Sequence, residues 1–139
     1  MSMYTAYDVA HHILQIRNYV SVPVLGFAEL PKDVLSALLW LSAEWRNVDE
    51  MENLIKMGAD VYEMHQWFTV LDNIIQGHDG NWRVMTETVV KQVEDSVKMI
   101  SSYGVTGKDL TKPWILSNCK DIIENSEYLC NFFSKQKMT

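Results

Sequence analysis

Apolar residues recur along most of this chain at the three- and four-residue spacing of amphipathic helices. No run of strand-like alternation interrupts this pattern, and glycines separate the periodic segments at Gly58, Gly77 and Gly104. The pattern therefore predicts an all-α protein. The six predicted helices span about residues 5–19, 31–46, 49–57, 60–76, 81–104 and 113–133.

Polar residues before two of these segments indicate where the helices begin. Thr5 followed by Asp8, and Asp60 followed by Glu63, have the three-residue spacing of a capping box. They predict the starts of the first and fourth helices. The second helix, 31–46, is apolar around most of its circumference, so we expect other helices to cover it on more than one side.

The two cysteines lie in the predicted sixth helix, eleven residues apart. Cys119 and Cys130 would then be roughly 16 Å apart along the axis, too far for a disulfide. We predict reduced, buried thiols in an intracellular protein. Pro113 opens the same helix, and Trp114 and Phe133 are expected to pack inward.

Length and charge narrow the possible classes of protein. The chain has 139 residues, 47% of them hydrophobic, which suits one domain spanning 1–139. Twelve Lys and Arg against eighteen Asp and Glu give a net charge of −6, and no basic cluster is present, so we expect no nucleic-acid partner. We find no signal peptide, transmembrane segment or internal repeat, and predict a cytoplasmic protein.

Candidate catalytic and metal-binding groups fail simple spacing tests. Asp8, His11 and His12 share a helical face but lack a third ligand of defined geometry. His78-Asp79 resembles the His-Asp dipeptide of metal phosphohydrolases, although Asp79 in this turn is more simply a turn residue. Neither a glycine-rich phosphate loop nor a nucleophile elbow occurs. We therefore expect no enzyme, no catalytic residue, no metal site and no cofactor.

Bulky apolar residues meet a polar turn in the middle of the chain. The segment Asp79-Gly80-Asn81-Trp82-Arg83 resembles the first homology motif of the Bcl-2 family of apoptosis regulators, Asp-Gly-x-Asn-Trp-Gly-Arg. Residues 37–45, Ala-Leu-Leu-Trp-Leu-Ser-Ala-Glu-Trp, are similar to the third homology segment, Ala-Leu-x-x-Ala-Gly-Asp-Glu-Phe. One departure is that the glycine before Arg83 is absent, so Val84 occupies the strict arginine position.

This resemblance implies a Bcl-2-like helical bundle of about six or seven helices with a surface hydrophobic groove. Such a groove, between helices two to five, receives the amphipathic death helix of a pro-apoptotic protein. Asn81 and Arg83 would bind the aspartate of that helix. The residues expected to bind the ligand helix are Leu41, Trp45, Ile55, Phe68, Leu71, Ile75, Asn81, Trp82 and Arg83.

The same resemblance implies an apoptosis inhibitor that sequesters pro-apoptotic Bcl-2 proteins. Because the chain is compact and lacks the usual C-terminal anchor, it is most like virus-encoded members, which act in the host cytoplasm and reach mitochondria through their partners. A first alternative is a Bcl-2-like fold whose groove is closed or reused, either in a homodimer or to inhibit inflammatory signalling, as in some poxvirus relatives. A second is an unrelated acidic helical inhibitor or immunity protein, for which Trp82 would be fully buried. A third is a metal phosphohydrolase using His78 and Asp79.

Overall fold

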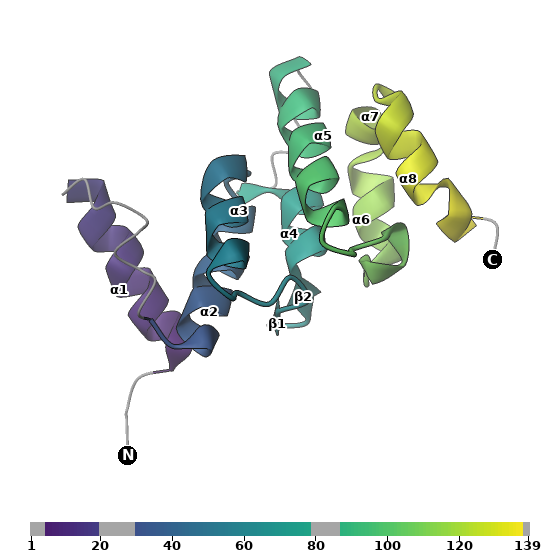
Figure 1. Ribbon diagram of the computed structural model, residues 1–139. Coiled ribbons are helices and arrows are strands. Elements are labelled where there is room, and N and C mark those ends of the chain that lie inside the picture. Colours follow the sequence, from purple (N-terminus) through teal and green to yellow (C-terminus); the bar gives the residue numbers. More distant parts are fainter. Residues whose placement is uncertain (1–4, 20–29, 79–86, 138–139) are drawn as a thin grey trace.

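The computed structural model describes residues 5–19, 30–78 and 87–137, and it is mostly helical (Figure 1). A short antiparallel hairpin, formed by β1 (Met64–His65) and β2 (Phe68–Thr69), pairs Met64 with Thr69 and His65 with Phe68. The all-α prediction is therefore confirmed at the level of fold class. The helices are α1 (Ala6–Tyr19), α2 (Lys32–Ala43), α3 (Val48–Lys56), α4 (Val70–Gln76), α5 (Glu87–Ser101), the 3₁₀ turn η3 (Gly107–Asp109), α6 (Pro113–Asn118), α7 (Lys120–Glu124) and α8 (Glu127–Lys137).

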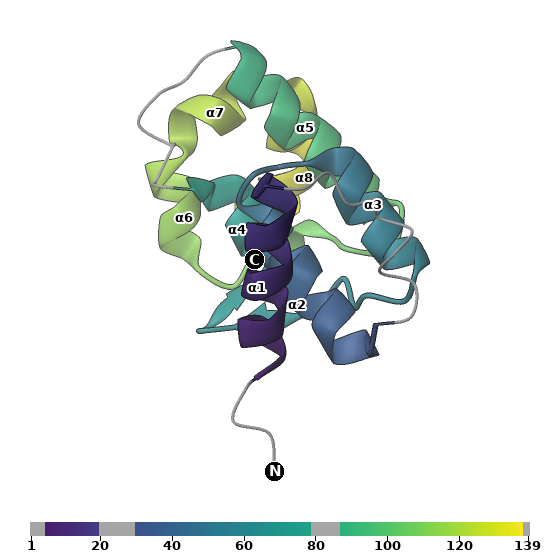
Figure 2. The same ribbon diagram turned by 90° about the vertical axis from the view of Figure 1, so that its left-hand side faces the viewer.

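The helices stack in two rows. In one row α2 packs against α4, and α4 packs against α6; in the other, α3 packs against α5, and α5 packs against α7. Helix α1 covers the outer side of α2, and α8 closes the opposite end beside α7 (Figures 1 and 2). The pair α2–α3 is therefore stacked on the pair α4–α5.

The loops that leave α3 and α5 repeat the same geometry. Gly58 and Gly104 follow these helices with φ values of 117° and 104°, which favour glycine. In each loop the residue after the glycine donates its N–H back into the last helical turn, at 2.9 Å for Ala59 and 3.4 Å for Val105. The two loops share this helix end, whereas the rest of each loop differs: the first contains the hairpin and the second contains η3.

The predicted helix 60–76 is wrong in its first half. The Asp60 carboxylate accepts the backbone N–H two residues on, at 2.9 Å, and forms a turn instead of a helix cap. The capping box that opens α4 belongs to Thr69 and Asp72, whose reciprocal hydrogen bonds measure 2.8 and 3.1 Å. Between β1 and β2, Gln66 and Trp67 take φ values of 52° and 72°, the left-handed pair needed for a two-residue hairpin turn.

The predicted helix 113–133 is divided into α6, α7 and α8. Cys119 leaves helical geometry, with φ −104° and ψ 20°, and the Ser126 hydroxyl accepts the N–H of the residue three positions on to open α8. The breaks change which side chains face the core. Cys119 and Phe133 are buried, as expected, but Cys130 is exposed and Trp114 is 45% exposed, so those two burial predictions were wrong.

Helix α2 is packed against α1, α3 and α4. Every residue from Val34 to Ala43 is buried, which confirms that this apolar helix needs cover on several sides. The predicted cap of α1 is also confirmed, since Thr5 and Asp8 exchange hydrogen bonds at 2.9 and 3.2 Å. No helix within residues 5–19, 30–78 and 87–137 is both long and apolar enough to cross a membrane.

Candidate functional site

The candidate site is built on a buried arginine that joins the ends of α2 and α4. Helix α2 stops at Ala43, and Arg46 takes a φ of 55°, which carries its guanidinium into the interior, where only 5% of the residue is exposed. There Nε donates to the Ile74 carbonyl at 2.7 Å and Nη2 donates to the Ile75 carbonyl at 3.2 Å. Burial lowers the pKa of Arg46. The carbonyls at the C-terminal end of α4 carry partial negative charge and stabilise the cation there.

Trp45 and His78 form the exposed part of this junction. The Trp45 ring is 63% exposed and stacks on the His78 ring, with centroids 4.1 Å apart and planes at 23°. The backbone N–H of His78 donates to the Glu44 backbone carbonyl at 3.0 Å. The ring Nδ1 of His78 lies 3.2 Å from the Glu44 carboxylate. The end of α4 is thus held against the end of α2. This places Trp45 beside the residue that immediately precedes the segment 79–83.

An open pocket of about 370 Å³ lies next to this stack. The Trp40 indole donates to the Phe68 carbonyl at 2.8 Å, and the Asn73 amide donates to the Trp40 carbonyl at 3.1 Å, so α2, the hairpin and α4 are linked around it. Its lining combines three aromatic rings with carboxylate and amide groups. The lining residues are Trp40, Glu44, Gln66, Phe68, Asn73, Gln76, Gly77 and His78.

On the other side of Phe68, a second group of aromatic and basic side chains extends the surface. Phe68 packs edge to face on Trp114, with ring centroids 6.1 Å apart. The Lys112 ammonium lies 5.4 Å from the centre of the Phe68 ring and also donates to the Trp67 carbonyl. Trp67 itself, at the tip of the hairpin, is 78% exposed. These contacts hold Phe68 in place between the pocket and α6.

The structure brings together only some of the predicted ligand-binding residues. Trp45 and Phe68 lie at the pocket or directly beside it, while Leu41, Leu71 and Ile75 are buried in the core at 7%, 1% and 0% exposure. Leu71 borders a different pocket, of about 240 Å³, on the side of α4 that faces η3.

Of the remaining predicted residues, the structure describes only Ile55. Ile55 on α3 is half-buried, packs against the core and does not line the pocket beside Trp45. Asn81, Trp82 and Arg83 lie outside the described residues.

Several pocket residues were not predicted. Trp40 and Glu44 belong to the segment 37–45 and are four residues apart, so their position on one face of α2 could have been recognised from the sequence. Gln66 and Asn73 carry no such signal. Gln66 reaches the pocket because the chain turns back in the hairpin, which the helical interpretation of 60–76 excluded.

The titratable side chains of the described residues bear on which chemical groups the surface offers. No cluster of three or more His, Cys, Asp or Glu side chains within them could hold a metal ion. The Asp8 carboxylate accepts hydrogen bonds from Thr5 N and Oγ1, and these bonds lower its pKa. Burial raises the pKa of Cys119 to about 11, so that side chain is a neutral thiol near pH 7. The pocket beside Trp45 supplies stacking surfaces from its aromatic rings, hydrogen-bond acceptors from its amide groups and negative charge from Glu44.

Comparison of the chain with protein-family models, curated proteins and solved structures found no match.

Proposed function

We propose that this protein binds an amphipathic helix of a partner protein at the surface between Trp45 and Phe68. The observation that carries the proposal is the stack of Trp45 on His78, which holds an exposed aromatic ring beside the open pocket. Exposed aromatic side chains held on a rigid frame contribute strongly to protein interfaces. Here the frame is the Arg46 junction between α2 and α4.

The partner class that we propose is the pro-apoptotic helix, and the biological outcome is suppression of cell death. This choice depends on the similarity of residues 37–45 and 79–83 to Bcl-2 homology segments. Because Leu41, Leu71 and Ile75 are buried, the apolar contacts that the described residues offer such a ligand would come mainly from Trp45 and Phe68. The stacked helix pairs do not themselves favour this partner, so its identity has to be tested directly.

A second candidate is favoured by the shape of the fold. Helix pairs connected through a β-hairpin and stacked in a row are the building plan of ankyrin-type repeats, whose extended surfaces bind other proteins. In this chain Trp67 stands at the hairpin tip with 78% of its surface exposed and a φ of 72°. A bulky residue held in that conformation is costly to maintain. The second candidate is therefore a repeat-type module that docks a partner through the hairpin.

Titration with a panel of pro-apoptotic helical peptides tests the first candidate by calorimetry. Binding with a Kd below about 10 µM, near −7 kcal/mol, is expected for at least one peptide. Trp45→Ala should weaken this binding by about 30-fold or more, the loss typical of a binding hot spot. Trp67→Ala is the matched control, since it also removes an exposed tryptophan but lies at the hairpin tip.

The pair of variants separates the two candidates. If a peptide binds and only Trp67→Ala weakens it, the ligand surface is the hairpin and the first candidate is wrong. If no pro-apoptotic peptide binds below about 10 µM, the cell-death function loses its mechanism. Both tryptophans are exposed, so neither variant should alter the melting temperature by more than a few degrees, and circular dichroism checks this.

A further inference from the structure

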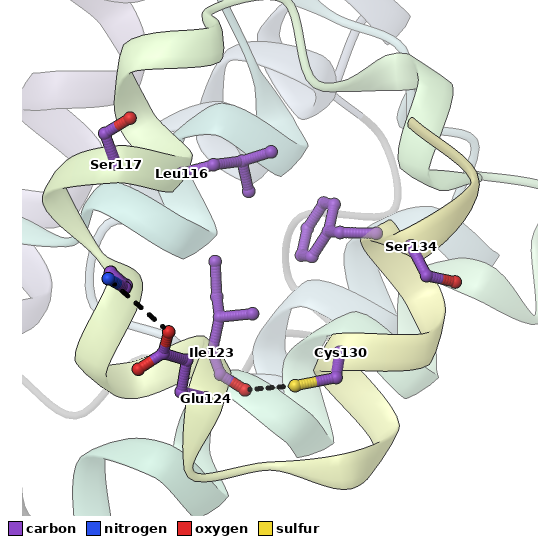
Figure 3. Close-up of a pocket in the computed structure, with 8 residues that line it drawn as sticks. Leu116, Ser117, Ile123, Glu124, Cys130 and Ser134 are labelled. Carbon is purple, nitrogen blue, oxygen red and sulfur yellow. Dashed lines mark hydrogen bonds and ion pairs between the residues drawn. The ribbon is translucent and has the colours of Figure 1, made fainter. Parts of the chain in front are cut away.

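A second pocket lies at the other end of the molecule, between α6, α7 and α8 (Figure 3). It has a volume of about 380 Å³. Leu116 from α6 and Ile123 from α7 point into it (Figure 3). Phe133 from α8 adds to the apolar lining. Cys130 lies at its edge, where Sγ donates to the Ile123 carbonyl at 3.1 Å. None of these residues belongs to the surface around Trp45.

The pocket exists because the chain is broken twice between 113 and 133. The breaks at 119 and 125–126 turn three short helices around a common space instead of forming one continuous helix. Ile123 and Phe133 are 6% and 1% exposed, so the inner part of the pocket is apolar. A volume of this size lies within the range of small-molecule sites in proteins.

Charged side chains stand at the rim of the pocket. Lys120 and Glu124 form an i,i+4 pair on α7, with Nζ and Oε1 3.8 Å apart. Their side chains are 69% and 57% exposed. Exposed pairs of this kind contribute little energy, so the ammonium can turn toward another anion at small cost. An apolar interior with an available cation at its entrance suits a molecule that has an alkyl body and a negatively charged end.

We propose that this pocket binds a free medium-chain carboxylic acid. The alkyl chain occupies the space between Leu116, Ile123 and Phe133, and the carboxylate lies at the rim near Lys120. A bound chain covers Cys130, whose thiol forms part of the lining. This site is separate from the peptide surface, so either proposal can fail without the other.

The rate of thiol modification reports occupancy of the pocket. Cys130 is exposed and Cys119 is buried, and burial raises the pKa of Cys119 to about 11. A maleimide reagent should therefore modify Cys130 while Cys119 stays unmodified, as peptide mass spectrometry resolves. With decanoate at about ten times its Kd, roughly nine-tenths of the pockets are filled and the rate at Cys130 should fall about tenfold. Acetate at the same concentration should leave the rate unchanged.

Two lysine variants test the position of the carboxylate. Lys120→Met keeps the alkyl stem but removes the charge, and it should weaken protection by decanoate up to about fivefold, with no effect on protection by 1-decanol. Lys91→Met is the matched control because Lys91 also forms an exposed i,i+4 pair, with Asp95 on α5, and does not line the pocket. It should leave protection by both compounds unchanged.

Three results would overturn the proposal. Decanoate could fail to slow the modification of Cys130 at any concentration that leaves the protein folded. Cys130 could be protected only at concentrations at which Cys119 also becomes reactive, which would mean that the protection comes from unfolding and not from a filled pocket. Leu116→Trp, which fills the pocket from its partly exposed wall, could retain full decanoate protection, and this would place the ligand elsewhere.

Discussion

Replacing Gly77 by alanine should destabilise the protein, because the new methyl group enters the space that the Arg46 guanidinium occupies. A Cβ at Gly77 would lie 2.5 Å from Arg46 Nη2 and 3.0 Å from Cζ. The backbone of Gly77 also has φ 73° and ψ 173°, a region almost restricted to glycine. Alanine therefore adds backbone strain and displaces the side chain that joins α2 to α4.

The expected loss follows from these two effects. Backbone strain of this kind costs about 1–3 kcal/mol. Moving the guanidinium weakens its bonds to the Ile74 and Ile75 carbonyls, and a hydrogen bond to a charged group contributes about 1.5–3 kcal/mol. Because the side chain can shift and keep part of this interaction, we expect Gly77→Ala to lower the free energy of unfolding by about 2–5 kcal/mol in total.

Gly58→Ala is the matched control for the clash. Gly58 also has a positive φ, 117°, but no heavy atom lies within 4 Å of the position that an added methyl group would take. It should therefore show the cost of strain alone. Urea unfolding followed by circular dichroism gives both free energies. The reasoning is refuted if Gly77→Ala costs no more than Gly58→Ala, or if the effects of Gly77→Ala and Arg46→Ala are simply additive in the double variant.

Three further predictions concern other contacts. Asp72→Asn should lower the free energy of unfolding by about 2–3 kcal/mol. The buried Asp72 carboxylate accepts hydrogen bonds from the backbone N–H of Thr111 at 2.9 Å and from the Thr111 hydroxyl at 2.5 Å. An unchanged urea midpoint would contradict this prediction. Burial raises the pKa of Cys119 above its ordinary value of 9.0 to about 11, so its contribution to stability is complete below pH 9 and lost as pH rises toward 11. Cys119→Ala should remove this part of the pH dependence, and an identical profile in the variant would show another cause. Tyr7→Phe should lower the free energy of unfolding by about 1–3 kcal/mol, because it removes the 2.5 Å hydrogen bond from the Tyr7 hydroxyl to Glu63 that connects α1 to the loop before β1. A melting temperature equal to that of the wild type would exclude this role.

The cap of α1 and the burial of α2 could be predicted because both depend on local features. Thr5 and Asp8 are close in sequence, and their hydrogen bonds need no other part of the chain. Helix α2 is apolar on all sides, and such a helix is stable in water only when covered. Each conclusion follows from residues within a few turns of one another.

The start of α4 could not be decided in this way, because two capping-box patterns compete between residues 60 and 72. Contacts with distant residues favour the second. The backbone N–H of Asp60 donates to the Ser36 hydroxyl at 2.8 Å, and the His65 ring stacks on Tyr7 with centroids 3.6 Å apart. His65 also meets Trp40 edge to face. These contacts favour an extended hairpin against α1 and α2, and a helix at 60–69 would lose them.

The candidate site shows the same division. The sequence indicates that Trp45, Phe68 and the segment 79–83 carry bulky or polar groups of interest. Only the tertiary structure shows that Trp45 meets His78, that Arg46 is buried beneath them, and that Leu71 and Ile75 belong to the core. Helical spacing marks the apolar face of an element but does not indicate whether a partner element or solvent covers it.

By itself, then, the sequence determined the helical class, the acidic charge and the most apolar helix, since composition and periodicity are local properties. The tertiary structure decided the stacking of helix pairs, the choice of Thr69 over Asp60 as the cap, and the exposure of Cys130 beside a pocket. Those outcomes depend on contacts between residues far apart in the chain, whose free energies outweigh local helix preference.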